Sequence, residues 1–197
     1  MAFANYHKAH EKQYIRELVA DTAAHSKAKN ILSLSAETFE SEMAMIKVNP
    51  NCNIDCVDYG HDTYLAAQKT YKDLHPRYKN RITLQLDNIF NKDFSKYDFI
   101  FLDLCGTITD TLIPNIVSAC RGFKGHIFIT LTKGRDGGLK DSYGLKKEEI
   151  QGFRTVTFPK LLNQFGNLKQ VGQIKEYSNK SVNSHAVTMM LYHFIKK

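Results

Sequence analysis

The chain has 197 residues, of which 43% are hydrophobic and 24% are charged, so it can bury the core of one globular domain. No apolar run approaches the ~20 residues that cross a bilayer, and the first residues lack the apolar centre of a secretion signal. We therefore expect a cytoplasmic protein with no membrane partner. The formal net charge of +7 makes nucleic acid a possible partner, although the lysines are dispersed along the chain.

The spacing of apolar residues predicts alternating helices and short strands. An amphipathic helix over residues 5–28 leads into a first strand at residues 31–35 and a helix over residues 37–46. A polar stretch is expected to run through Glu149. The other expected elements are strands at 54–58, 82–86, 99–102 and 126–131, helices at 63–74, 110–120 and 160–165, and final strands at 168–177 and 185–195.

Strands that alternate with helices are typical of a parallel sheet covered on both faces, and two final strands with a short polar connection are typical of an antiparallel hairpin. The sequence therefore predicts an α/β fold, a doubly wound, mostly parallel sheet of seven strands with a C-terminal antiparallel hairpin. Residues 1–28 are expected to form a helical segment packed on a domain of residues 29–197.

Three of the predicted strands end at an aspartate. Asp58, Asp87 and Asp103 each follow a short apolar run. Because the carboxyl ends of parallel strands line one crevice, the three carboxylates are expected at one edge of the sheet. A ligand with a ribose and several hydrogen-bond donors fits such an edge better than a phosphate does.

The four cysteines do not form a convincing zinc set. Cys52 and Cys56 flank a predicted strand, which separates them too far for easy shared ligation, and Cys105 and Cys120 lack a Cys-x-x-Cys or histidine partner. We expect buried, reduced thiols and no metal site.

Five strand–helix units followed by an antiparallel hairpin resemble the class I S-adenosylmethionine-dependent methyltransferases, from about residue 29 onward. The resemblance implies a Rossmann-like fold and S-adenosylmethionine as cofactor. It also implies that Asp58, at the end of the second strand, accepts hydrogen bonds from the ribose hydroxyls, with Tyr59 beside it in the same site. Asp87 and Asn88 correspond to the positions near the adenine. Each of these acids can instead be a turn residue or a helix cap.

The turn after the first strand departs from the family. Members carry a glycine-rich turn there, whereas residues 33–40 contain no glycine. The resemblance implies that the small residues Ser35 and Ala36 permit close approach of the cofactor and that Glu37 reaches its amino group.

The segment that follows the fourth strand, residues 103–111, has three interpretations. In methyltransferases this loop faces the transferred methyl group, which places Asp103 beside the substrate. Gly106 and Thr107 also match the Asp-x-Asp-Gly-Thr motif of haloacid dehalogenase-like phosphatases, but Cys105 replaces the second aspartate. Cys105 is alternatively a nucleophile, as in cytosine-carbon methyltransferases, although Leu104 replaces the usual proline.

A flexible glycine-rich loop over residues 133–138 follows the fifth strand. Lys133 and Arg135 lie in it and are candidates for binding the phosphates of a nucleic acid, while the alternative is an ordinary mobile loop. The function that the sequence favours is an S-adenosylmethionine-dependent methyltransferase acting on nucleic acid, with Asp103 orienting the acceptor. The alternative is a methyltransferase-like scaffold without catalysis that binds nucleic acid or a protein.

Overall fold

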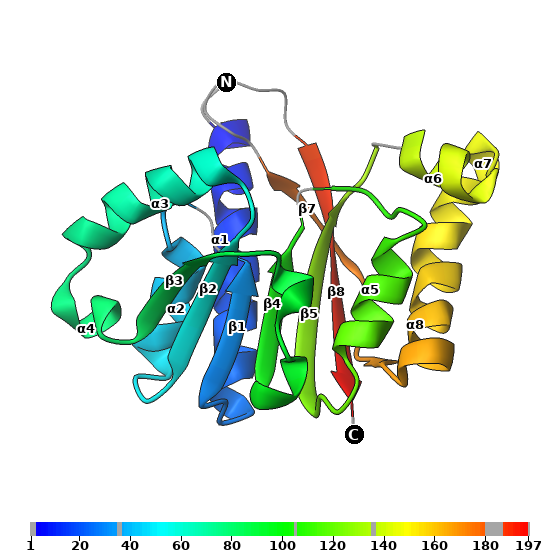
Figure 1. Cartoon of the computed structure of the whole chain (residues 1–197). Helices are drawn as coiled ribbons and strands as arrows, with labels where there is room; N and C mark the ends of the chain where they lie inside the picture. Colours follow the sequence, from blue (N-terminus) through cyan, green and yellow to red (C-terminus); the bar gives the residue numbers. More distant parts are fainter. Residues whose placement is uncertain (1–2, 35–36, 105, 135–136, 180–186, 197) are drawn as a thin grey trace.

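A computed structural model describes residues 3–34, 37–104, 106–134, 137–179 and 187–196, which form one twisted sheet with helices on both faces (Figure 1). The strands are β1 (Asn30–Leu34), β2 (Asn53–Asp58), β3 (Ile82–Leu86), β4 (Phe99–Asp103), β5 (Gly125–Thr132), β6 (Lys169–Gln170), β7 (Lys175–Asn179) and β8 (Val187–Lys196). The helices are α1 (Phe3–His25), α2 (Glu40–Val48), α3 (His61–Asp73), α4 (Pro76–Lys79), α5 (Leu112–Ala119), α6 (Gly137–Tyr143), α7 (Lys147–Gly152) and α8 (Phe158–Gly166). Two single 3-10 turns, η1 (Ile89–Asn91) and η2 (Phe94–Lys96), and a π-helical segment, η3 (Phe153–Thr157), complete the elements.

The strands lie in the order β3-β2-β1-β4-β5-β8-β6, and β7 also pairs with β8. Strands β1 to β5 are parallel to one another, whereas β8 runs antiparallel to β5, β6 and β7. The α/β class and the mostly parallel sheet with an antiparallel C-terminal part are confirmed. The sheet has eight strands where the sequence predicts seven.

The additional strand comes from the region expected to form one strand over residues 168–177. Gln170 pairs with Phe194 and Lys175 with Leu191, so the four residues 171–174 lie opposite only two residues of β8. Gly172 has a φ of 68° within this bulge, a left-handed conformation that glycine adopts without steric cost. The apolar pattern of the run does not reveal the bulge, because the pattern reports burial and not pairing.

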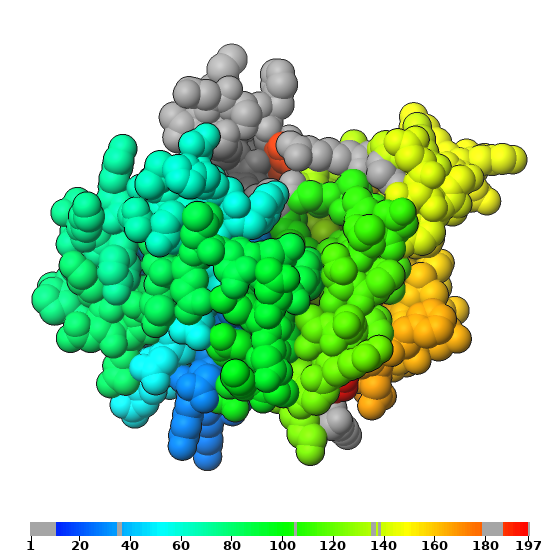
Figure 2. Space-filling model, viewed as in Figure 1, coloured from blue at the N-terminus to red at the C-terminus, as the bar shows by residue number. Residues whose placement is uncertain are grey.

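Residues that alternate along the strands supply two apolar cores, one on each face of the sheet. Ile31 of β1 packs in the core beneath α1, α2 and α3, and the next residue, Leu32, packs in the core beneath α5, α7 and α8. Figure 2 views the molecule from the α5 side, where α5 and the segment between β3 and β4 cover the sheet. The sheet is thus buried on both faces, as expected of a doubly wound fold.

The C-terminal half contains more helix than the sequence predicts. Helix α6 and helix α7 occupy residues expected to be a polar stretch, and α7, η3 and α8 continue without a break over residues 147–166. The wide π-helical segment η3 lies directly before Pro159, which lacks an N–H and crowds the carbonyl of the preceding turn. No helix among the described residues has both the length and the apolarity to cross a bilayer.

Candidate functional site

Three aspartates lie together at the carboxyl edge of the sheet, as predicted. Asp58 ends β2 and Asp103 ends β4, and both strands are parallel neighbours of β1. Asp87 follows β3, and its backbone N–H donates to the Asp58 carbonyl oxygen at 3.0 Å. Whether these residues border a common cleft stays a prediction. Two clefts that the described residues form lie instead at the opposite, amino edge of the sheet.

Asp58 joins β2 to α3. One carboxylate oxygen, Oδ1, accepts hydrogen bonds from the Gly60 N–H at 2.7 Å and from the Thr63 hydroxyl at 3.0 Å. The expected alternative of a turn residue is therefore present in the structure, because Oδ1 binds the N–H two residues along the chain, but it occupies only one oxygen, since the described residues give Oδ2 no partner. Tyr59 is 76% exposed beside it. An acceptor oxygen and an exposed aromatic ring thus lie next to each other at this edge.

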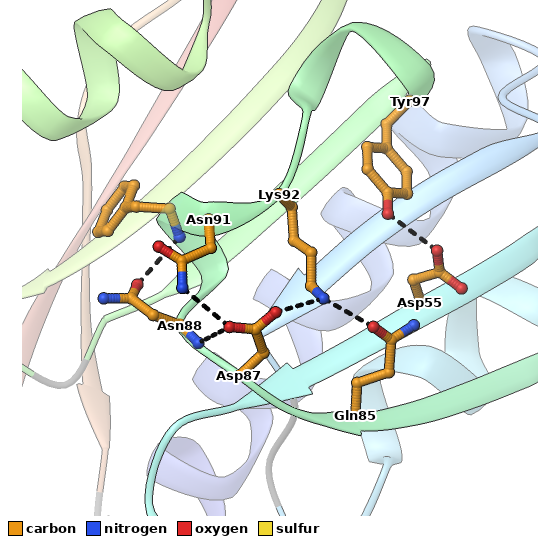
Figure 3. A network of polar contacts seen from close by, with 8 residues as sticks. Asp55, Gln85, Asp87, Asn88, Asn91, Lys92 and Tyr97 are labelled. Carbon is orange, nitrogen blue, oxygen red and sulfur yellow. Dashed lines mark hydrogen bonds and ion pairs between the residues drawn. The ribbon is translucent and has the colours of Figure 1, made fainter.

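Asp87 is the centre of a polar network (Figure 3). Its Oδ2 forms an ion pair with the Lys92 ammonium at 2.6 Å, and its Oδ1 accepts from the Asn88 N–H and the Asn91 amide at 2.7 Å and 2.9 Å. The hydrogen bond from Lys92, followed by those from Asn91 and Asn88, lowers the pKa of Asp87 to about 2. Lys92 also donates to Gln85 at 2.7 Å, which ties the network to β3.

The side chain of Asn88 is also used locally. Its oxygen accepts from the Phe90 N–H at 3.0 Å and caps η1. Asp87 and Asn88 therefore stabilise the turn that follows β3, and any contact of theirs with a ligand is made in addition to these bonds.

The turn after β1 reaches its conformation without glycine. Phe39 has a φ of 53°, in the left-handed region that non-glycine residues rarely occupy, and its side chain is fully buried beneath α2. Burial of the ring offsets the steric cost of this backbone conformation. Glu37 is exposed in the turn, whereas Ser35, for which a cofactor contact is expected, lies outside the described residues.

Asp103 is partly exposed at the end of β4 and is bonded to β5. The Thr130 hydroxyl donates to Asp103 Oδ1, and the two residues are also register partners in the sheet. Thr130 is fully buried, so its hydroxyl fixes the orientation of the carboxylate.

Glu42 is a functional candidate that the sequence analysis did not identify. It projects from α2 toward β1, where its Oε1 accepts from the Ser33 hydroxyl at 2.5 Å, and only 1% of the residue is exposed. The pKa of Glu42 is raised to about 7, chiefly by burial; the nearby Asp103 contributes to the rise, and the bond from Ser33 and the charge of Arg16 oppose it. A carboxyl group that titrates near neutrality therefore lies just behind the candidate catalytic residue. Its burial could have been predicted from its spacing, since Glu42 falls three residues after Phe39 on the apolar face of its helix.

The loop after β4 contains an unpaired hydroxyl. Thr107 Oγ1 is buried and has no hydrogen-bond partner among the described residues. The adjacent Gly106 carbonyl oxygen accepts from the Thr132 N–H at 2.8 Å, which anchors the loop on β5. Cys105, the alternative nucleophile, lies outside the described residues. Cys52, Cys56 and Cys120 are free, buried thiols, and burial raises the pKa of each above its usual value.

Lys133 is engaged by an acidic side chain. Its ammonium contacts both carboxylate oxygens of Glu176 in β7, at 2.7 Å and 2.8 Å. The pair neutralises a cation that the sequence analysis assigns to nucleic-acid phosphates, so Lys133 would have to exchange Glu176 for a phosphate. Arg135, the other cation of this loop, lies outside the described residues.

The residues present fit the nucleoside half of a nucleotide-like cofactor. Asp58 Oδ2 offers an acceptor for sugar hydroxyls, and the exposed Tyr59 ring offers a face for stacking. No set of three or more metal-ligating side chains is found within the described part of the chain.

No protein-family model matches this chain, and no curated protein matches it in sequence. Solved structures do match its fold. The O-methyltransferase TomG from Streptomyces achromogenes, in complex with SAM, is 10% identical, with a TM-score of 0.57 over 92% of this chain and 79% of that one. An O-methyltransferase from Bacillus cereus, in complex with SAH, is 13% identical, with a TM-score of 0.57 over 93% of this chain and 81% of that one.

A third structure is an RNA-processing protein. The fibrillarin pre-rRNA processing protein of Methanococcus jannaschii is 15% identical, with a TM-score of 0.54 over 86% of this chain and 67% of that one. At these identities the likeness concerns architecture. The chain has the Rossmann-like fold of the class I S-adenosylmethionine-dependent methyltransferases.

Proposed function

We propose that the protein is an S-adenosylmethionine-dependent methyltransferase that acts on a nucleic acid. The observation that carries the proposal is Asp58, which ends β2 of a methyltransferase fold with one carboxylate oxygen bonded to α3 and the other without a partner among the described residues. A carboxylate in this position accepts two hydroxyls of a ribose. Structures with the same fold are complexes with SAM or SAH, which supports the choice of cofactor.

The proposed cofactor site runs along the carboxyl edge. Asp58 binds the ribose, and the exposed ring of Tyr59 packs against the adenine. Asp87 and Asn88 border the adenine from the turn after β3 while keeping their local bonds. Ser35 and Glu37, in the turn after β1, bind the amino-acid half.

The bound cofactor supplies an electrophilic methyl group on a positively charged sulfur. Asp103 accepts a hydrogen bond from the acceptor nitrogen or oxygen and orients its lone pair, and Thr130 keeps the Asp103 carboxylate in place. Positioning, rather than a covalent intermediate on the protein, is the contribution of these residues.

The net charge of +7 supports a nucleic-acid substrate, as do the cations Lys133 and Arg135 in the segment of sequence that follows β5. One of the structures with this fold is a pre-rRNA processing protein, whereas others are O-methyltransferases. The choice of a nucleic acid as the substrate therefore rests on the positive charge of the protein.

The alternative is a scaffold that keeps the fold without the reaction. It is favoured by the absence of glycine from residues 33–40 and by the local bonds that Asp87 and Asn88 already make. Such a protein binds nucleic acid or a protein partner and transfers no methyl group.

Calorimetric titration with S-adenosylmethionine distinguishes the two. In Asp58→Asn the side-chain oxygen still accepts from Gly60 and Thr63, but an amide N–H₂ replaces the outward oxygen and cannot accept from a ribose hydroxyl. We expect the variant to lose roughly ten- to a hundred-fold in affinity, because a charge-assisted hydrogen bond contributes about 1.5–3 kcal/mol.

Asp93→Asn is the matched control, because Asp93 caps η2 through the same kind of bonds to Ser95, away from the proposed site. Unchanged affinity in Asp58→Asn would remove Asp58 from the site. No heat of binding for the unaltered protein, and no radiolabelled methyl incorporated into total RNA or DNA, would contradict the enzyme and leave the scaffold.

A further inference from the structure

The amino edge of the sheet, opposite the candidate cofactor site, carries two clefts with the same kind of lining. The first cleft, of about 570 Å³, is lined by Lys47, Arg77 and Arg81 together with Ile46, Pro50 and Asn80. The second, of about 520 Å³, is lined by Lys27, Lys29 and Lys124 together with Ser26, Asp98, Gly125 and His126. Each cleft therefore presents three cations.

The register of the strands aligns these cations in a row. Arg81 directly precedes β3, Lys29 directly precedes β1 and Lys124 directly precedes β5. Because Asn30 pairs with Asn53 and Phe99 with His126, the strands begin at nearly the same level. Five neighbouring strands at ~4.8 Å spacing place Arg81 and Lys124 roughly 19 Å apart, with Lys29 near the middle.

No cation of this edge forms an ion pair with another described residue. The ion pairs found between described residues involve Arg16, His61, Lys92 and Lys133, and none involves a cation of the two clefts. The one carboxylate in their lining, Asp98, accepts the backbone N–H groups of Lys29 and Asn30 at 2.9 Å and 3.0 Å. Six cations therefore line the two clefts against the single carboxylate of Asp98, which leaves the row net positive.

We infer that the amino edge binds the phosphate backbone of a nucleic acid. The row spans roughly five or six nucleotide steps of ~3.4 Å, which is longer than a single nucleotide and suits a strand lying across both clefts. A flat lipid surface would reach only the rim of the clefts, whereas phosphates of a strand can enter them. The segments that lead into β1 (blue) and β5 (light green) project from this lower edge in Figure 2.

This surface is separate from Lys133, which directly follows β5 at the other end of the strands. A nucleic acid can therefore be held at the amino edge whether or not the carboxyl edge binds a cofactor. The test uses the full chain without S-adenosylmethionine, so its outcome is independent of the proposed reaction.

The probe is a fluorescein-labelled 20-nucleotide single-stranded RNA, measured by anisotropy at several salt concentrations. In the triple variant Lys29→Gln, Lys47→Gln and Lys124→Gln, we expect at least a tenfold loss of affinity at low salt. The slope of log affinity against log salt should fall by about 2, because each lost phosphate contact on a single strand contributes about 0.7.

The control removes three exposed lysines elsewhere, Lys69 on α3, Lys147 on α7 and Lys160 on α8, by the same change to Gln. It has the same net charge as the test variant and should keep most of the affinity. Equal losses in both variants would show a response to net charge alone and overturn the inference. Absence of RNA binding at low salt would also overturn it, as would binding to phosphatidylserine vesicles without binding to RNA. Thermal unfolding of both variants checks that they are folded.

Discussion

Glu42 combines a buried setting with a position directly behind Asp103. Its pKa rises from 4.5 to about 7, chiefly because burial penalises the charged form. The folded state therefore keeps a proton that the unfolded state loses above pH ~4.5, so this residue makes stability decrease as the pH rises from about 5 to about 7. A shift of this size corresponds to on the order of 3 kcal/mol.

Glu42→Gln should remove this pH dependence, since the amide oxygen still accepts from Ser33 and carries no charge. Urea unfolding at pH 5, 6, 7 and 8 measures the effect, and the variant should be the more stable protein at pH 8. Glu17→Gln, which changes an exposed carboxylate of α1, should leave the pH dependence in place. Parallel pH curves for Glu42→Gln and the unaltered protein would contradict the prediction.

Some residues at the carboxyl edge could be located from the sequence, and others could not. The position of Asp58 at this edge could be predicted because Asp58 ends an apolar run, and the strand ends of a parallel sheet share an edge. The role of Glu42 could not be predicted, because it depends on the contact between α2 and β1, which no local pattern encodes. The pairing of Lys133 with Glu176 joins residues 43 positions apart and was equally inaccessible.

Among the elements, the entry into β5 is the most constrained. Gly125 has a φ of 149°, and a Cβ built on it would lie 2.0 Å from the Asp98 carbonyl oxygen, which also accepts the His126 N–H. Gly125→Ala therefore forces the starts of β4 and β5 apart. We expect a loss of roughly 1–3 kcal/mol in the free energy of unfolding, measured by urea denaturation.

Gly152→Ala is the contrasting substitution. Gly152 has helical angles, φ −60° and ψ −39°, and a Cβ there would meet no atom within 4 Å. The same chemical change should stabilise the protein by roughly 0.5–1 kcal/mol, because alanine loses less conformational freedom in a helix. If both variants moved stability in the same direction, the steric explanation for Gly125 would be wrong.

Strands β1 to β5 were predictable because each is a short apolar run between turn residues. Helices α6 and α7 were not, because glycines and charges at residues 134–149 favour a loop on propensity alone, and Leu139 and Ile150 become helical by packing into the core. Tertiary contacts, not local preference, decide this region.

At the scale of the whole molecule, α1 connects the beginning of the chain to its last strands. Ile15, Val19 and Ala23 are buried against the sheet, and the Lys175 ammonium of β7 donates to the Tyr14 hydroxyl at 3.1 Å. We therefore propose that residues 1–28 are part of the folding unit. A chain shortened to residues 29–197 should lose cooperative unfolding, since it exposes an apolar face contributing several kcal/mol of a total of about 5–15.

A chain of residues 11–197, which keeps Ile15, Val19, Ala23 and the bond between Tyr14 and Lys175, is the control and should unfold cooperatively. Urea denaturation followed by near-ultraviolet circular dichroism compares the two. If the chain of residues 29–197 unfolded at the same urea concentration as the full chain, α1 would not be part of the folding unit.

The bulge between β6 and β7 has a consequence for how the molecule behaves among copies of itself. An uninterrupted outer strand offers a row of free N–H and C=O groups to the sheet of another molecule, which is the usual route to aggregation. Here residues 171–174 break that row, and the pieces on either side have two and five residues. The interruption therefore protects this edge of the sheet against addition of a foreign strand, in a protein whose opposite edge strand, β3, has only five residues.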